Sequence, residues 1–189
     1  MPAEREARID AREQLLVAAQ ALYAEAGVAA TTPRQILHRS GIGQGSLYHH
    51  FPSKRDLARA AVERTAQEQL HVAEAVLVGD QTPLERVLAY LLRDRDALAG
   101  CRIGRLTSDQ AVMSDANLLE PVEGYFSGLI ELLGSALEES GMPEDRARDR
   151  AAAIVSVVQG GYVLARATGD PERMRSAVRG MAALLEGEL

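Results

Sequence analysis

The chain has 189 residues, a formal net charge of −6 and 47% hydrophobic residues, which suits a packed globular protein of one or two domains. Its single cysteine, Cys101, excludes an internal disulfide and fits a reducing cytoplasm. The charged N-terminal stretch predicts no secretory signal. The longest apolar run, residues 151–165, is shorter than the roughly 20 residues of a membrane span. We therefore expect a cytoplasmic protein without a membrane partner.

Charge is unevenly distributed along the chain. Residues 31–60 hold five cations and one anion, whereas the chain after residue 60 holds 13 arginines and 21 acids. A small basic region on an acidic body is typical of a protein whose one end contacts nucleic acid. A solvated surface with chance clustering remains the alternative.

Helical periodicity predicts the N-terminal elements in order. The first helix is expected from about Asp10 to Ala26, ending at Gly27. A second starts at Thr32, with Pro33 at its first position and Gln35 completing a capping box, and ends near Gly41. A third covers about 44–50. Ser53 caps a long helix of about 53–78.

The second part of the chain follows the GDQTP stretch at residues 79–83. Helices are expected near 83–98, 103–111, 117–140, 144–168 and 171–187, and no alternating strand pattern is present. The predicted fold is therefore all-α, with a three-helix domain over residues 1–56 and a helical domain over residues 57–189.

The stretch SGIGQGSLYHHFPSK, residues 40–54, decides what the N-terminal domain does. A dinucleotide-binding loop needs G-x-G-x-x-G between a strand and a helix, and a P-loop needs G-x-x-x-x-G-K-[ST]. Here Gly41, Gly43 and Gly45 have neither spacing and follow a helix. Two short helices joined by a glycine-containing turn instead define a helix-turn-helix.

The expected third helix has an apolar and a polar face. Leu47 and Phe51 are four residues apart and are expected to pack inward with Ile36 and Ile42. The outward arc then carries side chains suited to a major groove, since an amide pairs with adenine and a hydroxyl donates or accepts. Its members are Gln44, Gly45, Ser46, Tyr48 and His49. An ordinary polar helix face is the alternative. The two histidines, His49 and His50, point about 100° apart, so no joint metal site is expected.

Lys54, the only lysine of the chain, lies with Arg55 in the first turn of the expected long helix. The helix dipole disfavours cations there. A docked phosphate would reverse this effect, because both cations and the backbone N–H groups would then face an anion. Two solvated cations are the alternative interpretation.

The run TTPRQILHRSGIGQGSLYHHFPSKRDL, residues 31–57, closely resembles the DNA-binding region of the TetR (tetracycline-repressor-like) family of bacterial transcription regulators. The resemblance implies a homodimeric repressor of double-stranded palindromic DNA with a C-terminal ligand-binding and dimerisation domain. It implies phosphate contacts for Thr32, Tyr48 and Lys54, contacts on or near base edges for Gln44, Gly45, Ser46 and His49, and a backbone contact for His50. Arg34 belongs to the same expected DNA-binding set.

The last two long helices are expected to pair with those of a second protomer. Ala152, Ser156 and Gly160 form a stripe of small residues on the first helix. Ala177, Gly180, Met181 and Leu184 offer a matching face on the second. An intramolecular helix pair without a dimer is the alternative.

A small-molecule effector of unknown identity would bind among the middle helices. Apolar residues at helical spacing are usually ordinary core, so each candidate also has that interpretation. The candidates are Leu106, Gln110, Met113, Tyr125, Phe126, Leu129, Gln159, Tyr162 and Arg166, of which Arg166 would suit an anionic ligand.

The competing class is a helical enzyme or small-molecule carrier that retains a degenerate helix-turn-helix. All four histidines fall within the first 71 residues, so none is near Cys101 in sequence to activate it. No H-E-x-x-H or multi-cysteine metal pattern is present. The sequence therefore predicts no catalytic residue, no metal and no cofactor.

Overall fold

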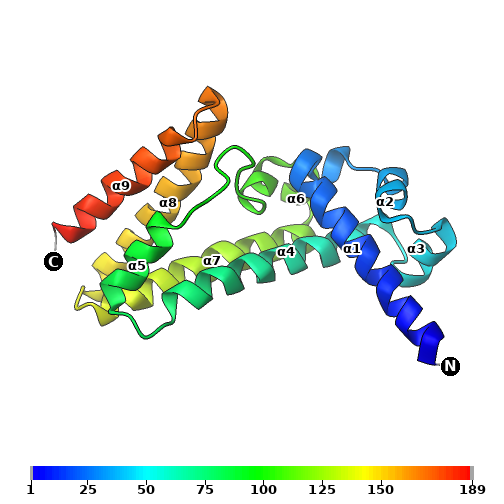
Figure 1. The fold of residues 1–189 in the computed structure, drawn as a ribbon, viewed down its shortest axis with the longest axis horizontal. Coiled ribbons are helices and arrows are strands. Elements are labelled where there is room, and N and C mark those ends of the chain that lie inside the picture. Colours follow the sequence, from blue (N-terminus) through cyan, green and yellow to red (C-terminus); the bar gives the residue numbers. More distant parts are fainter. Residues whose placement is uncertain (1, 188–189) are drawn as a thin grey trace. The chain divides into compact units, whose positions relative to one another are not determined.

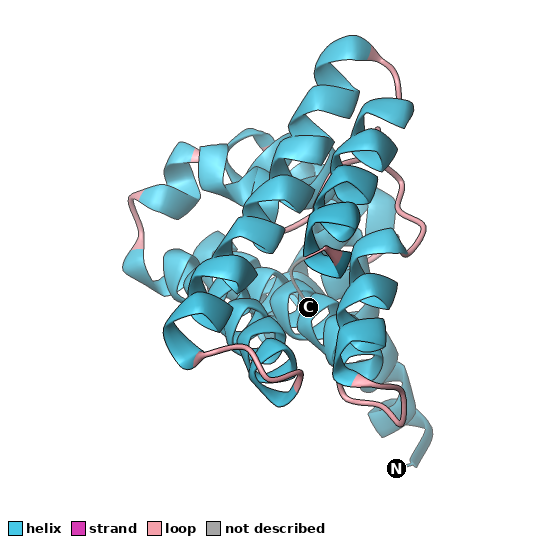
Figure 2. Cartoon of the chain, turned by 90° about the vertical axis from the view of Figure 1, so that its left-hand side faces the viewer, coloured by secondary structure: helices cyan, strands magenta, loops and turns pink. Residues whose placement is uncertain are grey.

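The computed structural model describes residues 2–187, with side chains from Ala11 onward. Helices joined by loops and turns make up this part of the chain, which contains no strand (Figure 2). The elements are α1 (Pro2–Ala30), α2 (Pro33–Ser40), α3 (Gln44–His50), α4 (Lys54–Leu77), α5 (Pro83–Leu92), a 3₁₀ helix η1 (Gly104–Ser108), α6 (Gln110–Met113), α7 (Ala116–Glu139), α8 (Glu144–Thr168) and α9 (Glu172–Glu186). The predicted all-α class is confirmed.

The chain divides into two compact units. Unit 1 comprises residues 1–67 and 102–123, and unit 2 comprises residues 68–101 and 124–189. This division does not coincide with the predicted boundary between residues 56 and 57. The continuous helix α4 runs through that boundary, and the segment 102–123, which is distant in sequence, packs with the N-terminal helices.

Unit 1 is built on α1, which packs against both α2 and α3 (Figure 1). Its core contains the fully buried Leu15, Ala19, Ile36 and Leu57. The helical geometry of α1 breaks at Gly27, where φ is 84° and ψ is 171°. Only glycine adopts this region readily, so the predicted stop is found at Gly27, although helical turns continue to Ala30.

Unit 2 is dominated by the pair α8 and α9, which lie side by side, and α5 also packs on α9 (Figure 1). Gly161 permits the close approach of α8 to α9, because a Cβ at this position would lie 3.0 Å from Cγ and 3.4 Å from Cα of Met174. By length and hydropathy alone α8 could cross a membrane. A core helix passes the same test, and α8 buries one face against its neighbours.

Two predicted helices are shorter than expected. The expected 83–98 helix ends at Leu92, because Arg93 adopts extended geometry with ψ of 147°. The expected 103–111 helix is a 3₁₀ helix followed by the single-turn α6. In the second segment, Arg105 and Asp109 bond to the distant end of α1, whereas in the first Arg95 bonds to the nearby carbonyl groups of α5.

Candidate nucleic-acid interface

Local capping interactions fix where α2 and α3 begin and where α2 ends. The Thr32 side chain accepts from the backbone N–H of Gln35, and the Gln35 side chain accepts from the N–H of Thr32 at 2.7 Å. Gly41 ends α2 in the left-handed region, with φ of 70°, and donates to Leu37 O at 3.0 Å. Gly43 caps α3 through its backbone alone. Both predicted helices and the turn are therefore confirmed.

Helix α3 separates a buried from an exposed face, as expected. Leu47 is buried, and Phe51 just after the helix is also buried beneath the guanidinium of Arg12 at 5.4 Å. Ile42, which was expected inside, is only half-buried, because it lies in the turn between the helices. The inward set is therefore smaller than predicted.

The predicted DNA-contacting side chains form the outer surface of this region. Tyr48 is 46% exposed, Gln44, Gly45 and His49 are exposed, and Ser46 is half-buried. A Cβ at Gly45 would meet nothing within 4 Å, so the helix surface there is open to an approaching backbone. Thr32 and Arg34 are also exposed, whereas half-buried His50 stacks edge-on against His49, with ring centroids 5.1 Å apart.

The cations that begin α4 have partners inside unit 1. Lys54 Nζ donates to Val28 O at 3.1 Å. Arg55 binds Asp115 through both carboxylate oxygens, at 2.5 and 2.6 Å. The hydrogen bond from Arg55 lowers the pKa of Asp115 to about 2, while partial burial opposes the shift. These contacts offset the helix-dipole penalty without any bound phosphate, so a phosphate contact by Lys54 stays a prediction.

The segment 102–123 holds the end of α1 at two points. Arg105 donates through its two terminal nitrogens to the carbonyl oxygens of Ala24 and Glu25. Asp109 Oδ2 accepts from the backbone N–H groups of Val28 at 2.6 Å and Ala29 at 3.1 Å. The break at Gly27 thus leaves free carbonyl groups on one side and free N–H groups on the other, and one segment satisfies both sets.

Asp109 and Arg105 had no assigned role at the sequence level. Asp109 also caps α6 by accepting from Ala111 N at 2.9 Å, and an aspartate before a short helix is a recognisable capping signal. Its second role depends on residues 80 positions away, for which the sequence contains no signal. Together with Arg55 and with Arg59, which donates to Asn117 at 3.2 Å, Asp109 ties α1 and α4 to this segment.

The predicted effector residues are distributed over both units. Leu106, Gln110 and Met113 lie in unit 1, where Leu106 is buried and the other two are exposed. In unit 2, Tyr125 and Leu129 are buried, Phe126, Gln159 and Tyr162 are half-buried, and Arg166 is exposed. The role of these residues stays a prediction. Within the described residues, no group of three or more His, Cys, Asp or Glu side chains is placed to hold a metal ion.

Most of the predicted dimerisation residues lie at the surface of unit 2. Ala152, Ser156, Gly180 and Leu184 are exposed, and Gly160 and Ala177 are half-buried. Met181 differs, since it is buried within its own chain and cannot present its side chain in the same way. Three large apolar residues of α8 and α9 are exposed nearby in the sequence: Val163 at 66%, Leu164 at 51% and Leu184 at 60%.

A capped helix, a glycine turn and a second helix with an exposed polar arc, packed on a supporting helix, define a helix-turn-helix DNA-binding protein. Residues 15–61 match the description "Bacterial regulatory proteins, tetR family", and residues 82–179 match "Transcriptional regulator LmrA/YxaF-like, C-terminal domain". The chain therefore belongs to the TetR family and is a DNA-binding transcription regulator.

Individual relatives agree with this assignment. The chain is 30% identical over 189 residues to the uncharacterized HTH-type transcriptional regulator Rv0196 of Mycobacterium tuberculosis, covering 94% of this chain and 95% of that protein. It is 29% identical to YxaF of Bacillus subtilis, covering 86% and 88% of the two chains. A crystal structure of a TetR-family regulator from Agrobacterium tumefaciens matches with a TM-score of 0.82 and 26% identity, covering 93% of this chain and 97% of that one.

Proposed function

We propose that this protein is a homodimeric, cytoplasmic repressor that leaves a palindromic operator when a small-molecule effector binds its C-terminal part. The exposed polar arc of α3 is the observation that carries the proposal, since an apolar face fixes the helix and leaves base-reading side chains outward. KstR2 of Mycobacterium tuberculosis, named a transcriptional repressor, is 33% identical over 87 residues, 46% of this chain. That name favours repression over activation.

The DNA contacts follow from exposure and chemistry. Gln44 has the amide that pairs with adenine, and Ser46 and His49 reach base edges beside it. Thr32, Arg34, Tyr48, His50 and Lys54 contact phosphates, which fix the register of the helix on the duplex. Gly45 allows the sugar-phosphate backbone to come close to α3.

Dimerisation uses α8 and α9. Their exposed small residues permit close helix approach, and the adjoining Val163, Leu164 and Leu184 leave apolar area that a second protomer would remove from water. Two-fold symmetry then presents two α3 helices to half-sites about 34–36 Å apart.

Effector release requires a ligand that favours a conformation in which the two reading helices no longer match this spacing. Helix α4 is the proposed lever, because it starts at Lys54 in unit 1 and ends at Leu77 in unit 2. Coupling energies of about 1–3 kcal/mol change operator affinity roughly 5- to 150-fold. We infer no catalytic activity. The competing function is that of a helical enzyme or small-molecule carrier with a degenerate helix-turn-helix.

Operator binding tests the proposal. The DNA flanking the protein's own gene, and a genome-wide selection on purified protein if that DNA fails, supply the target. Wild type should protect a palindrome and lose about a thousandfold in affinity between 50 and 200 mM salt if about six phosphates are contacted. Tyr48→Ala should bind much more weakly with a similar salt dependence, because the tyrosine hydroxyl carries no charge and releases no counterions.

A matched control is Val72→Ala, since Val72 is 50% exposed and lies on α4 far along the chain from α3. It should bind as wild type does. Equal, weak binding by wild type and Tyr48→Ala to every selected sequence would refute operator-specific DNA binding. It would favour an enzyme or carrier with a degenerate helix-turn-helix.

A further inference from the structure

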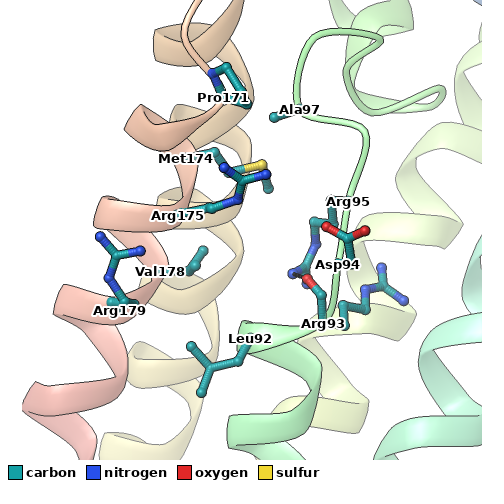
Figure 3. A pocket seen from close by; sticks show the side chains of 10 residues that line it. All are labelled: Leu92, Arg93, Asp94, Arg95, Ala97, Pro171, Met174, Arg175, Val178 and Arg179. Atoms are coloured by element: carbon teal, nitrogen blue, oxygen red, sulfur yellow. Dashed lines mark hydrogen bonds between the residues drawn. The ribbon is translucent and has the colours of Figure 1, made fainter.

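Unit 2 contains a groove of about 250 Å³ that none of the predicted effector residues lines. It lies between the chain that leaves α5 and the first half of α9 (Figure 3). Its volume is just below the range of drug-sized pockets, so it suits a small ligand. The lining residues are Leu92, Arg93, Asp94, Arg95, Ala97, Pro171, Met174, Arg175, Val178 and Arg179.

The polar side of the groove is strongly cationic in an otherwise acidic chain. Four arginines and a single aspartate line it, whereas the whole chain has a net charge of −6. Glu172, next to the groove, binds Arg179 at 2.5 Å and Arg175 more loosely at 3.5 Å. One carboxylate thus serves two guanidinium groups, and the excess positive charge remains.

Arg95 is a largely buried cation whose partners are all neutral. Its terminal nitrogens donate to the carbonyl oxygens of Leu91 at 2.7 Å, Arg93 at 3.0 Å and Tyr90. Buried charges in proteins are normally compensated by an opposite charge. Here burial, with Arg93 nearby, lowers the pKa of Arg95, and the Nε atoms of both arginines are buried without a hydrogen-bond partner.

Arg95 and Arg175, the two guanidinium groups best placed to bind an anion, line opposite walls of the groove. In Figure 3, Arg95 runs from the segment after α5 back toward the end of α5 along one wall of the groove, and Arg175 extends from α9 toward that segment. Arg175 is 58% exposed and held only by its long contact to Glu172, so it can turn toward a ligand at little cost. Guanidinium groups match carboxylate and phosphate oxygens in charge and geometry.

The remaining lining is apolar. Leu92 is 51% exposed, and Met174, Val178 and Ala97 form the neighbouring floor. A hydrocarbon tail lying on these residues would gain about fourfold in affinity for each methylene that it buries. A charged head and a short apolar tail are therefore accommodated side by side.

We propose that this groove binds an amphipathic organic anion, with its carboxylate or phosphate head at Arg95 and Arg175 and its tail along Leu92 and Val178. We further propose that such an anion is the effector, a step that rests on the proposed function of ligand-released operator binding. The binding of the anion itself does not depend on that function.

Calorimetric titration of the full chain with three probes of equal tail length tests the site. Nonanoate and octyl phosphate distinguish a carboxylate from a phosphate head, and octylammonium reverses the charge. One or both anions should bind, with affinity falling as salt screens the arginines, and the cation should not. Octylammonium binding as tightly as the anions would overturn the proposal.

Variants locate the binding within the groove. Arg175→Gln should weaken anion binding about tenfold, as expected for a lost charged hydrogen bond. Arg173→Gln is the matched control, because Arg173 is 62% exposed on the same helix, has a similar 3.5 Å contact to Asp170 and lies outside the groove. Equal losses in the two variants would place the anion elsewhere and refute the site.

The tail is tested in the same way. Leu92→Gln should reduce the gain in affinity from hexanoate to octanoate, while Leu98→Gln, at a residue 46% exposed and outside the lining, should not. Both leucines are exposed, so neither variant depends on the fold tolerating a core change. An unchanged gain in Leu92→Gln would contradict the proposed path of the tail.

Operator binding with saturating anion separates the two parts of the proposal. A fall in operator affinity for wild type, but not for Arg175→Gln, would support the effector role. Anion binding in the groove without any change in operator affinity would leave the site intact and overturn its role as effector site. A protein that binds the anion but selects no DNA would instead refute the proposed function.

Discussion

Removing the Asp109 carboxylate should destabilise the helix-turn-helix of α2 and α3, although Asp109 lies about 60 residues beyond α3 in the chain. The carboxylate accepts from three backbone N–H groups, at Val28, Ala29 and Ala111, over 2.6–3.1 Å. A hydrogen bond to a charged group contributes about 1.5–3 kcal/mol, and loss of a helix cap costs about 0.5–2 kcal/mol. Because water can replace part of these bonds, we expect Asp109→Ala to lower the free energy of unfolding by about 2–4 kcal/mol.

Urea unfolding followed by far-ultraviolet circular dichroism measures this loss. Asp109→Asn should lose about half as much, since its amide oxygen can still accept from one or two of the N–H groups. Asp145→Ala is the control, because Asp145 is 98% exposed with only a 4.0 Å contact to Arg148, and it should stay within about 0.5 kcal/mol of wild type.

Operator affinity gives a second readout of the same change. Val28 and Ala29 lead directly into the Thr32 cap of α2, so loosening them should weaken DNA binding in Asp109→Ala while Asp145→Ala is unaffected. If Asp109→Ala lowers the free energy of unfolding by less than about 1 kcal/mol and leaves operator affinity unchanged, this carboxylate does not position the helix-turn-helix.

Three further predictions concern packing, pH and assembly. Gly161→Val should lower the free energy of unfolding by about 1–3 kcal/mol, because a Cβ there would lie 3.0 Å from a side chain of α9. Gly124→Ala is the control, since a Cβ at Gly124 would meet nothing within 4 Å, and it should not destabilise the protein. Equal losses of the two variants in urea unfolding would contradict the close packing of α8 on α9. Because the pKa of Asp115 is lowered, its bond to Arg55 stabilises the fold fully above the ordinary aspartate pKa of about 4. This contribution is lost as the pH falls toward about 2. Asp115→Asn should remove this part of the acid sensitivity, and an unaltered acid transition in that variant would contradict the role of the ion pair. Leu184→Glu should shift the protein toward monomer in analytical ultracentrifugation, whereas an unchanged dimer would exclude that face.

The helix-turn-helix was predicted closely from the sequence, because helix caps and turn glycines act over only three or four residues. The predicted capping box of Thr32 and Gln35 is present. Gly41 ends α2 as expected. In each case the donor, the acceptor and the left-handed glycine lie within one helical turn of one another, so local chain energetics decide the outcome.

The end of α5 could not be predicted in this way. The residues after Leu92, RDRDALA, are compatible with a helix by propensity, and their charges suggest a solvated surface. In the structure Arg95 instead folds back onto the carbonyls of the last turn of α5 and is largely buried. The segment that carries Arg95 lines one groove together with the first half of α9, about 80 residues further along the chain.

The amino-acid sequence by itself determined an all-helical chain, the helix-turn-helix and the outward side of α3, because periodicity, caps and turn glycines are local properties of the chain. Only the tertiary structure decided that the segment 102–123 belongs with the head, that Asp109 holds the chain after Gly27, and that four arginines line a groove beside α9. Those features join residues tens of positions apart, and their energies depend on burial and on partners that packing alone brings together.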